Sequence, residues 1–349
     1  MRKLKIAHVT AYAPGCSGLY EASRDLAKAD ILSGHEVYIV DAGVFRNGKM
    51  EPGKPGQIDD RSGYKLETSD PFILNDVDLT IMHTGVADNY LVKSNCPLLW
   101  IVHGKPLDTF RPEEDGLRVS YSMYENVSKW SRTVKMVYFW EEYHNYWKNV
   151  FPADKHLVFK YPVIDRARFK PEGEIYQLKN KGKYNVLIAD STRADINLFE
   201  LVNGCIEAAR QIPGIKFHFV GQDRFNLNCW QILLKKLQEV NGLGDVIGRT
   251  TEMANLYRAV DLTFSPNRII NRVVAESLCC NVPVLQEKGS LVSDYNCYVP
   301  DVMDVVEGLK LFVSDFDKGI HKDGVLERSK VFDLKPYQDL INKVYESIT

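Results

Sequence analysis

Residues 264–285, FSPNRIINRVVAESLCCNVPVL, place three charged side chains four positions apart. Arg268, Arg272 and Glu276 therefore share one face if this segment is helical. A helix that begins near Asn271 offers unpaired backbone N–H groups, which bind phosphate well, and the two arginines would add positive charge there. An ionised Glu276, one turn deeper, can only accept hydrogen bonds, as it would from the paired hydroxyls of a ribose. The segment therefore suits a nucleoside diphosphate.

A plain ion pair between Arg272 and Glu276 is the competing interpretation. Arginines at the start of a helix face the wrong end of its dipole, so they need a negative partner. A carboxylate one turn away supplies that partner, and a surface pair of this kind is worth under about 1 kcal/mol. From this segment alone, the two interpretations are about equally good.

Other polar candidates follow the apolar runs that the sequence predicts as strands. His83 ends DLTIMH, His103 ends LLWIVH, and Gly221 ends IKFHFVG. Ligands of open α/β sheets bind beyond the carboxyl ends of the strands, so these residues are cleft candidates. Further candidates of this kind are Arg193, Gln222 and Asp223. A lone histidine more commonly serves as a core or surface residue held by a hydrogen bond.

Short apolar strands alternate with helical stretches along the whole chain. The predicted strands are 4–9, 37–42, 78–83, 97–104, 135–139, 185–191, 215–221, 260–265 and 283–286. The clearest predicted helices are three. One is amphipathic and stops at Gly34, and the other two cover residues 197–211 and 227–240. This alternation is typical of parallel sheets covered on both faces. We therefore expect an α/β fold with two doubly wound domains that face a ligand cleft.

A polar run rich in Lys and Gly, KPEGEIYQLKNKGKY, divides the strand–helix pattern. We expect an N-terminal domain over residues 1–170, a linker over 171–183 and a C-terminal domain over 184–332. Residues 333–349 are expected to form a helix that packs back on the N-terminal domain.

The composition of the 349-residue chain narrows the classes of function. A net charge of -2 weighs against a dedicated nucleic-acid binder. The seven cysteines lack CxxC spacing, so we expect neither a zinc site nor a disulfide framework, and a reducing cytosol fits. The N-terminal apolar run is too short for a signal peptide, and no stretch reaches the ~18 apolar residues of a membrane span. The expected location is the cytoplasm, with peripheral membrane contact left open.

The sequence also lacks the common cofactor and nucleophile motifs. PGCSGLYE, after the first predicted strand, does not have the order G-x-G-x-x-G, which weighs against a nicotinamide dehydrogenase. There is no P-loop lysine motif, no G-x-S-x-G elbow and no His or Cys pair with ligand spacing. We therefore expect no metal and no cofactor.

Seven segments together match the pattern of one enzyme family. They are Ser17-Gly18, GHEVYIV (34–40), VHG (102–104), YPVIDRARFKP (161–171), IKFHFVGQD (215–223), VIGRTTEMANLYRAVDLTFSP (246–266) and AESLCCNVPVL (275–285). GHEV alone is a weak signal, but the set comes in the right order at the right separations. The chain thus resembles the retaining glycosyltransferases of family 4 over most of its length. The resemblance implies the GT-B architecture, in which two Rossmann-like domains face an interdomain cleft.

The chain departs from the family's pattern at the donor site. Arg268 stands where the family has a first Glu, and Asn281 where it has a later Gly. Arg193 is placed to replace one basic diphosphate ligand of the family, and the second has no counterpart. Two alternatives therefore stay open, a non-catalytic sugar-nucleotide binding protein and a sugar-nucleotide epimerase, whose architecture is similar.

The resemblance implies transfer of a sugar from a nucleotide diphosphate sugar, UDP-sugar in the first place, to an acceptor hydroxyl. Transfer would proceed with retention and without a metal, and the leaving phosphate would take the acceptor's proton. The leaving diphosphate needs positive charge, which Arg193, Arg268 and Arg272 would supply. His103 would contact the donor sugar. The expected nucleotide ligands are Glu276, Gly221, Gln222, Arg249 and Val273, and Ser17 and Gly18 form the expected phosphate or acceptor loop.

The acceptor is expected on the N-terminal domain, where residues 128–149 interleave aromatic and basic side chains. Trp130, Trp140 and His144 are the acceptor candidates in this segment. It also suits a buried strand followed by an amphipathic helix, a membrane-surface patch for a lipid-linked acceptor, or base stacking on a nucleic acid. Glu141 and Glu142 count against both anionic partners, so the acceptor stays open between a glycan, a lipid-linked hydroxyl and a nucleic-acid hydroxyl.

Overall fold

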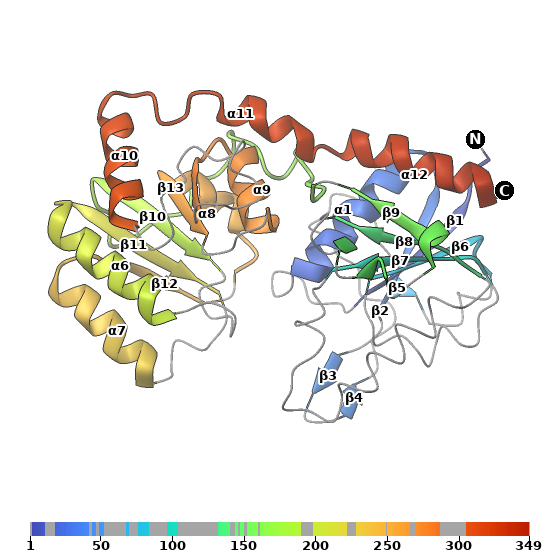
Figure 1. Cartoon of the computed structure of the whole chain (residues 1–349), viewed down its shortest axis with the longest axis horizontal. Helices are drawn as coiled ribbons and strands as arrows, with labels where there is room; N and C mark the ends of the chain where they lie inside the picture. Colours follow the sequence, from blue (N-terminus) through green and yellow to red (C-terminus); the bar gives the residue numbers. More distant parts are fainter. Residues whose placement is uncertain are drawn as a thin grey trace. The chain divides into compact units, whose positions relative to one another are not determined.

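The computed structural model divides the chain into two compact units (Figure 1). Unit 1 comprises Met1–Val163 and Leu334–Thr349, and unit 2 comprises Ile164–Asp333. The chain enters unit 2 at Ile164, before the boundary expected at residue 170. The residues that the structure describes are 2–10, 18–41, 44–46, 49–51, 68–69, 76–83, 96–103, 132–139, 144–145, 147–149, 152–159, 161–189, 198–221, 228–248, 250–265, 270–286 and 305–348.

Among the described residues, the sheet of unit 1 has seven strands in the order β5-β2-β1-β6-β7-β8-β9, and every pairing between them is parallel. The strands are β1 (Lys5–Thr10), β2 (Glu36–Asp41), β5 (Thr68–Ser69), β6 (Leu79–Met82), β7 (Leu98–Val102), β8 (Thr133–Tyr138) and β9 (His156–Val158). A separate antiparallel ribbon pairs β3 (Val44–Arg46) with β4 (Lys49–Glu51). The central strands are continuous apolar runs because a parallel sheet is buried on both faces.

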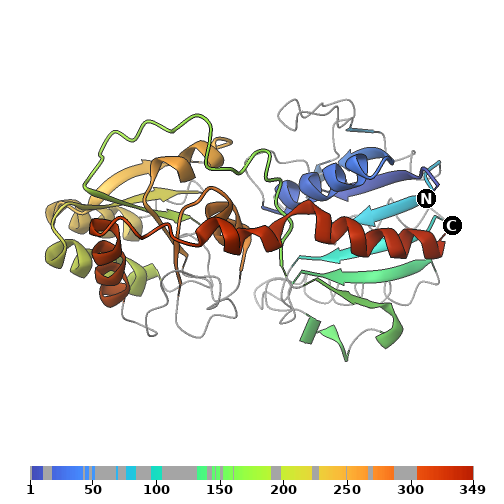
Figure 2. The same cartoon turned by 90° about the horizontal axis from the view of Figure 1, so that it is seen from above.

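Helices α1 (Gly18–Leu32) and α12 (Leu334–Ile348) run side by side on unit 1 (Figures 1 and 2). Both contribute to one apolar core with β1, β6 and β7, through residues such as Leu26 and Ile341. Gln338 Nε2 of α12 donates to the carbonyl of Ala29 at 2.9 Å. The end of the chain is therefore part of the N-terminal unit. The short helix η3 (Ala153–Lys155) precedes β9.

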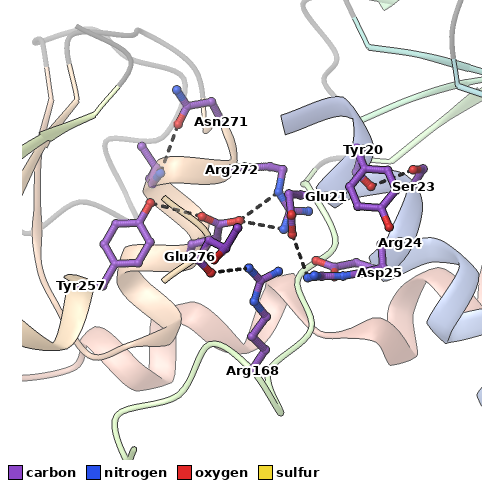
Figure 3. A network of polar contacts seen from close by, with 12 residues as sticks. Tyr20, Glu21, Ser23, Arg24, Asp25, Arg168, Tyr257, Asn271, Arg272 and Glu276 are labelled. Carbon is purple, nitrogen blue, oxygen red and sulfur yellow. Dashed lines mark hydrogen bonds and ion pairs between the residues drawn. The ribbon is translucent and has the colours of Figure 1, made fainter. Parts of the chain in front are cut away.

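Helix α1 is buried along most of its length, including charged side chains that an amphipathic helix would expose. Arg24 is paired on the same helix with Glu21 at 2.9 Å and Asp25 at 3.2 Å (Figure 3). These charges can be buried because each has a partner of opposite sign within hydrogen-bonding distance.

In the part of unit 2 that the structure describes, the sheet has five parallel strands in the order β12-β11-β10-β13-β14. They are β10 (Tyr184–Ala189), β11 (Ile215–Val220), β12 (Leu243–Ile247), β13 (Leu262–Ser265) and β14 (Val284–Gln286). Helices α6 (Leu198–Gln211), α7 (Asn228–Glu239) and α10 (Val305–Asp317) share one core with these strands. The remaining elements are α8 (Met253–Ala259), α9 (Arg272–Cys279), α11 (Val325–Arg328) and η6 (Ser329–Phe332), and α9 packs against α8, β13 and β14.

Both sheets are doubly wound, because the strand order reverses beside the first strand of each. In unit 1, β1 lies between β2 and β6, and in unit 2, β10 lies between β11 and β13. The prediction of an α/β chain with two Rossmann-like sheets is therefore confirmed. No helix in the described ranges is long and apolar enough to span a membrane.

Residues 171–183, expected as a linker, belong to unit 2 and are hydrogen-bonded to it. The Asp245 carboxylate accepts from the backbone amides of Lys179 and Asn180 at 2.7 and 2.9 Å. Arg258 Nε donates to the carbonyl of Glu174 at 2.7 Å. The segment is polar because it has no regular secondary structure. Its backbone groups form hydrogen bonds with buried or half-buried side chains of unit 2, so it is not a free linker.

Candidate functional site

The described candidate residues lie at the carboxyl edge of the two sheets. In unit 2, Gly221 directly follows β11, and α9 follows β13. In unit 1, His103 directly follows β7, and Gly18 opens α1 after β1. Ligands of doubly wound sheets bind at this edge. The other predicted site residues lie outside the described residues: Ser17, Trp130, Trp140, Arg193, Gln222, Arg249 and Arg268.

Helix α9 begins at Arg272 because Asn271 caps it. Asn271 has an extended backbone, and its Oδ1 accepts from the amide of Val274 at 3.1 Å. Its carbonyl accepts from the amide of Ala275 at 3.2 Å. Asparagine is among the best residues for this position. The cap therefore already engages one of the amides that the sequence analysis assigns to a phosphate, and Val273 lies in the same first turn.

The Arg272 and Glu276 side chains form an ion pair inside α9 (Figure 3). Arg272 donates to Glu276 Oε1 from Nε at 3.0 Å and from Nη2 at 2.7 Å. Tyr257 Oη of α8 donates to the other oxygen, Oε2, at 3.2 Å. The ion pair between Arg272 and Glu276 that the competing interpretation predicted is therefore present. The pair is not on the surface, since the two side chains are only 11% and 8% exposed.

This geometry fixes how the Glu276 carboxylate can meet a ligand. Oε1 accepts two N–H groups from Arg272, and Oε2 accepts the hydroxyl of Tyr257, so both oxygens already have donors. A ribose hydroxyl that binds Glu276 would have to share these acceptors. Arg168, near the start of unit 2, donates from Nη2 to the carbonyl of Thr251 at 3.4 Å. In this arrangement the guanidinium of Arg272 is directed at Glu276, and its predicted contact with a diphosphate stays a prediction.

Gly221 has a backbone conformation that favours glycine. Its φ is +148°, and a Cβ built there would meet no heavy atom within 4 Å. Its amide donates to the carbonyl of Ile247 at 3.3 Å. The space beside Gly221 and the backbone that a side chain would strain both fit a close approach of ligand to backbone. A Cβ built on Gly18 would likewise meet no heavy atom within 4 Å, but the φ of Gly18 is not positive.

His103 is not a lone histidine. Its Nε2 lies 3.1 Å from Nδ1 of His83, which lies at the end of the neighbouring strand. His83 is buried, and its Nε2 lies 2.9 Å from Nδ1 of His8 on β1. Burial lowers the pKa of His83 well below its usual value, and the adjacent His8 and His103 rings add to the effect. His83 is therefore a neutral imidazole that donates from one nitrogen and accepts at the other.

The described part of residues 128–149 is used in packing within unit 1. It includes the strand β8, and the side chain of Trp147 is buried. The ring of His144 stacks edge-on against those of Tyr138 and His156, at centroid distances of 5.4 and 4.9 Å. These contacts fit the buried-strand interpretation of the segment. An acceptor role of His144 stays a prediction.

Three residues that hold candidate side chains in place, one in unit 2 and two in unit 1, could not be predicted from the sequence. Tyr257 lies in helix α8, MANLYRA, and nothing in that pattern indicates that its hydroxyl meets Glu276. His8 lies inside the apolar run of β1 and Asp30 lies in helix α1, and the two become linked to His83 only when β1 pairs with β6 and α1 packs on β1. The one available signal was a polar residue inside a strand predicted to be buried. In the part of the chain that the structure describes, no group of three His, Cys, Asp or Glu residues could hold a metal ion.

No known protein-family model matches this sequence, and no curated protein matches it. Solved structures are similar over nearly the whole chain. HepE from Anabaena in complex with UDP and glucose is 13% identical with a TM-score of 0.71, over 99% of this chain and 100% of that one. Sucrose-phosphate synthase from Thermosynechococcus elongatus is 12% identical with a TM-score of 0.68, over 99% of both chains. An alpha-glucosyltransferase in complex with UDP and a 13-mer DNA containing a HMU base is 12% identical with a TM-score of 0.67, over 99% and 100%. The predicted GT-B fold is thereby confirmed.

Proposed function

We propose that this chain is a glycosyltransferase that uses a nucleotide diphosphate sugar, with UDP-sugar as the first choice of donor. The proposal is supported by a fold shared end to end with an alpha-glucosyltransferase whose structure contains UDP, and with HepE, whose structure contains UDP and glucose. Membership of family 4, retention at the anomeric carbon and independence of a metal belong to the same proposal. They are motivated by the segments AESLCCNVPVL and VHG in their expected order.

The Glu276 carboxylate, held between Arg272 and Tyr257, is the observation that carries the proposal. Arg272 donates to one oxygen of this carboxylate and Tyr257 to the other, so the orientation of the carboxylate is set before a ligand binds. Glu276 lies in α9, whose amino end is at the carboxyl edge of the unit 2 sheet. The ribose of a nucleotide would bind Glu276, and its diphosphate would lie toward the positive end of the α9 dipole.

The chemical step then needs little from the protein beyond positioning and charge. The leaving diphosphate carries the developing negative charge, which Arg193, Arg268 and the α9 amino end would stabilise. In unit 1, His103 would contact a hydroxyl of the donor sugar. The leaving phosphate would take the acceptor's proton, so no protein nucleophile is required.

The test is a screen of the full chain against UDP-, GDP- and ADP-sugars by thermal shift and by release of free sugar. We expect a UDP-sugar to raise the melting temperature, because a ligand that binds only the folded state stabilises it. We also expect slow release of sugar that continues in the presence of EDTA. Binding without turnover for every acceptor tried would favour the sugar-nucleotide binding protein, and a change of the sugar without acceptor would favour the epimerase.

The matched variant is Glu276→Ala, which should weaken nucleotide binding by about 1–3 kcal/mol, the worth of charge-assisted hydrogen bonds. Calorimetry measures this directly. Glu207→Ala is the control, since Glu207 pairs with Arg210 on the exposed face of α6. Unchanged affinity in Glu276→Ala would remove the ribose assignment, and absence of affinity for every nucleotide would remove the proposed function.

A further inference from the structure

Four side chains, those of Asp30, His8, His83 and His103, form one continuous hydrogen-bonded row inside unit 1. Asp30 of α1 lies at its inner end, with Oδ2 at 2.9 Å from His8 Nε2. His8 Nδ1 lies 2.9 Å from His83 Nε2, and His83 Nδ1 lies 3.1 Å from His103 Nε2. Tyr345 Oη of α12 donates to the other Asp30 oxygen, Oδ1, at 2.9 Å. The row runs from the core to the carboxyl edge of the sheet.

The strand register places the three histidines on one face of the sheet. His8 on β1 is level with Ile81 on β6, and Ile81 is level with Leu99 on β7. Residues two apart in a strand share a face. His83 is therefore one such step beyond the level of His8, and His103 is two steps beyond it. Each move to the next strand also moves one step toward the carboxyl edge.

The row is buried where it begins and partly exposed where it ends. Asp30 and His8 are fully buried, His83 is 1% exposed, and His103 is half-buried. The same face carries the apolar core that α1 and α12 cover. Polar groups in such a place are costly unless they are hydrogen-bonded, so the pairing of each ring nitrogen with the next is what makes the row tolerable.

The Asp30 carboxylate determines which atom donates and which accepts in each hydrogen bond of the row. An ionised Asp30 can only accept, so His8 must donate to it from Nε2. A neutral His8 then accepts at Nδ1, and His83 must donate to it from Nε2. His83 in turn accepts at Nδ1, so the proton of His103 lies on Nε2. A neutral His103 in this tautomer has a hydrogen-bond acceptor at Nδ1.

We propose that Asp30, His8 and His83 are positioning residues that fix the tautomer of His103, so that Nε2 carries the proton and Nδ1 accepts. A group that meets Nδ1 must then be a donor, such as a sugar hydroxyl, and a phosphate oxygen is disfavoured. The tautomer is a property of unit 1 alone. Its consequence for catalysis rests on the proposed function.

The wild-type test is the long-range 1H–15N spectrum of the imidazoles in the ¹⁵N-labelled full chain near neutral pH. Single His→Gln variants assign the rings of His8, His83 and His103. All three should be neutral Nε2–H tautomers. A protonated His8 would donate from both nitrogens and reverse every later bond, so a charged His8 or an Nδ1–H form of His83 or His103 overturns the proposal.

Asp30→Asn is the matched perturbation, because it changes only one atom of the carboxylate. Tyr345 donates to the Oδ1 position, so the amide oxygen should stay there and the NH₂ group should face His8 Nε2. That group only donates, so His8, His83 and His103 should all switch to Nδ1–H. Asp339→Asn on the exposed part of α12 is the control and should change none of them. An unchanged His103 tautomer in folded Asp30→Asn overturns the proposal.

Kinetics separate this inference from the proposed function. With a UDP-sugar donor, Asp30→Asn should lower kcat by about tenfold or more, as a misplaced imidazole proton does elsewhere, while nucleotide affinity is unchanged. If the tautomers reverse and kcat stays the same, the positioning role stands and the assigned role of His103 in sugar transfer falls. If Asp30→Asn does not fold, the wild-type spectrum still decides.

Discussion

At the scale of single residues, each unit holds a candidate polar side chain that is oriented before any ligand binds. The Glu276 carboxylate is held by Arg272 and Tyr257, and the His103 ring is held by His83. A side chain that is already oriented loses less conformational entropy when a ligand binds, so the entropic cost of binding is lower. Both residues were chosen from the sequence by type and position. The groups that hold them became apparent only in the structure.

His103→Ala should lower turnover more than it lowers nucleotide affinity. The reason is that His103 lies in unit 1 and is proposed to contact the sugar, whereas the nucleotide is assigned to unit 2. Turnover is measured as sugar release from a UDP-sugar, and affinity by calorimetry with UDP. His156→Ala, a histidine of β9 remote from the row, is the control. An equal loss of both quantities would contradict the role of His103 at the donor sugar.

At the scale of elements, α9 has two functions to reconcile at its amino end. Asn271 caps the helix, and the same end is proposed to face the diphosphate. Asn271→Ala should therefore destabilise the chain by about 1 kcal/mol, the usual worth of a cap. Urea unfolding measures this change.

Asn271→Asp separates the two functions of this position. Aspartate caps a helix as well as asparagine does, so stability should be near that of the wild type. Its negative charge would repel a diphosphate, so affinity for UDP should fall. Unchanged UDP affinity in Asn271→Asp would show that the phosphate does not lie near the α9 amino end.

At the scale of the whole molecule, both units bury neutral histidines, and this gives folding a pH dependence. In unit 2, His218 Nδ1 accepts from the amide of Asp245 at 2.9 Å, and its Nε2 lies 3.2 Å from Asn185 Oδ1. Burial lowers the pKa of His218 to about 4, against the opposing effect of Asp245 and Asp261. In unit 1, the pKa of His83 is lowered in the same direction.

The direction of the pH dependence of stability follows from the pH at which His218 binds a proton in the folded and in the unfolded chain. In the unfolded chain, His218 binds a proton below its ordinary pKa of about 6.5. In the folded chain, His218 does not bind that proton until the pH falls to about 4. Stability is therefore complete above about pH 6.5 and falls as the pH drops from there toward 4. His218 alone should cost about 3 kcal/mol across that window.

Urea unfolding at pH 7.5 and pH 4.5 checks this expectation in the wild type and in His218→Gln. The pH-dependent loss should be smaller in the variant, since carboxylates titrate equally in both chains. Equal losses in the two chains would show that His218 does not remain neutral in the folded state.

The sequence by itself determined the two α/β units, because apolar strand runs, helix stops such as Gly34 and strand-end polar residues are local patterns. It also determined that Arg272 and Glu276 share a helix face, since a spacing of four fixes that within any α-helix. The burial of that pair and the Tyr257 hydroxyl beside it could not be predicted, because they depend on which elements pack together.

Only the tertiary structure decided that His8, His83 and His103 form one row. Their strands are separated by long stretches of sequence, and the register between parallel strands is set by packing of the whole sheet. The same holds for Asp30 and Tyr345, which come from opposite ends of the chain and meet because α1 and α12 share one face of unit 1. Local patterns specify what a strand or helix is, whereas contacts between elements depend on the energy of the folded unit.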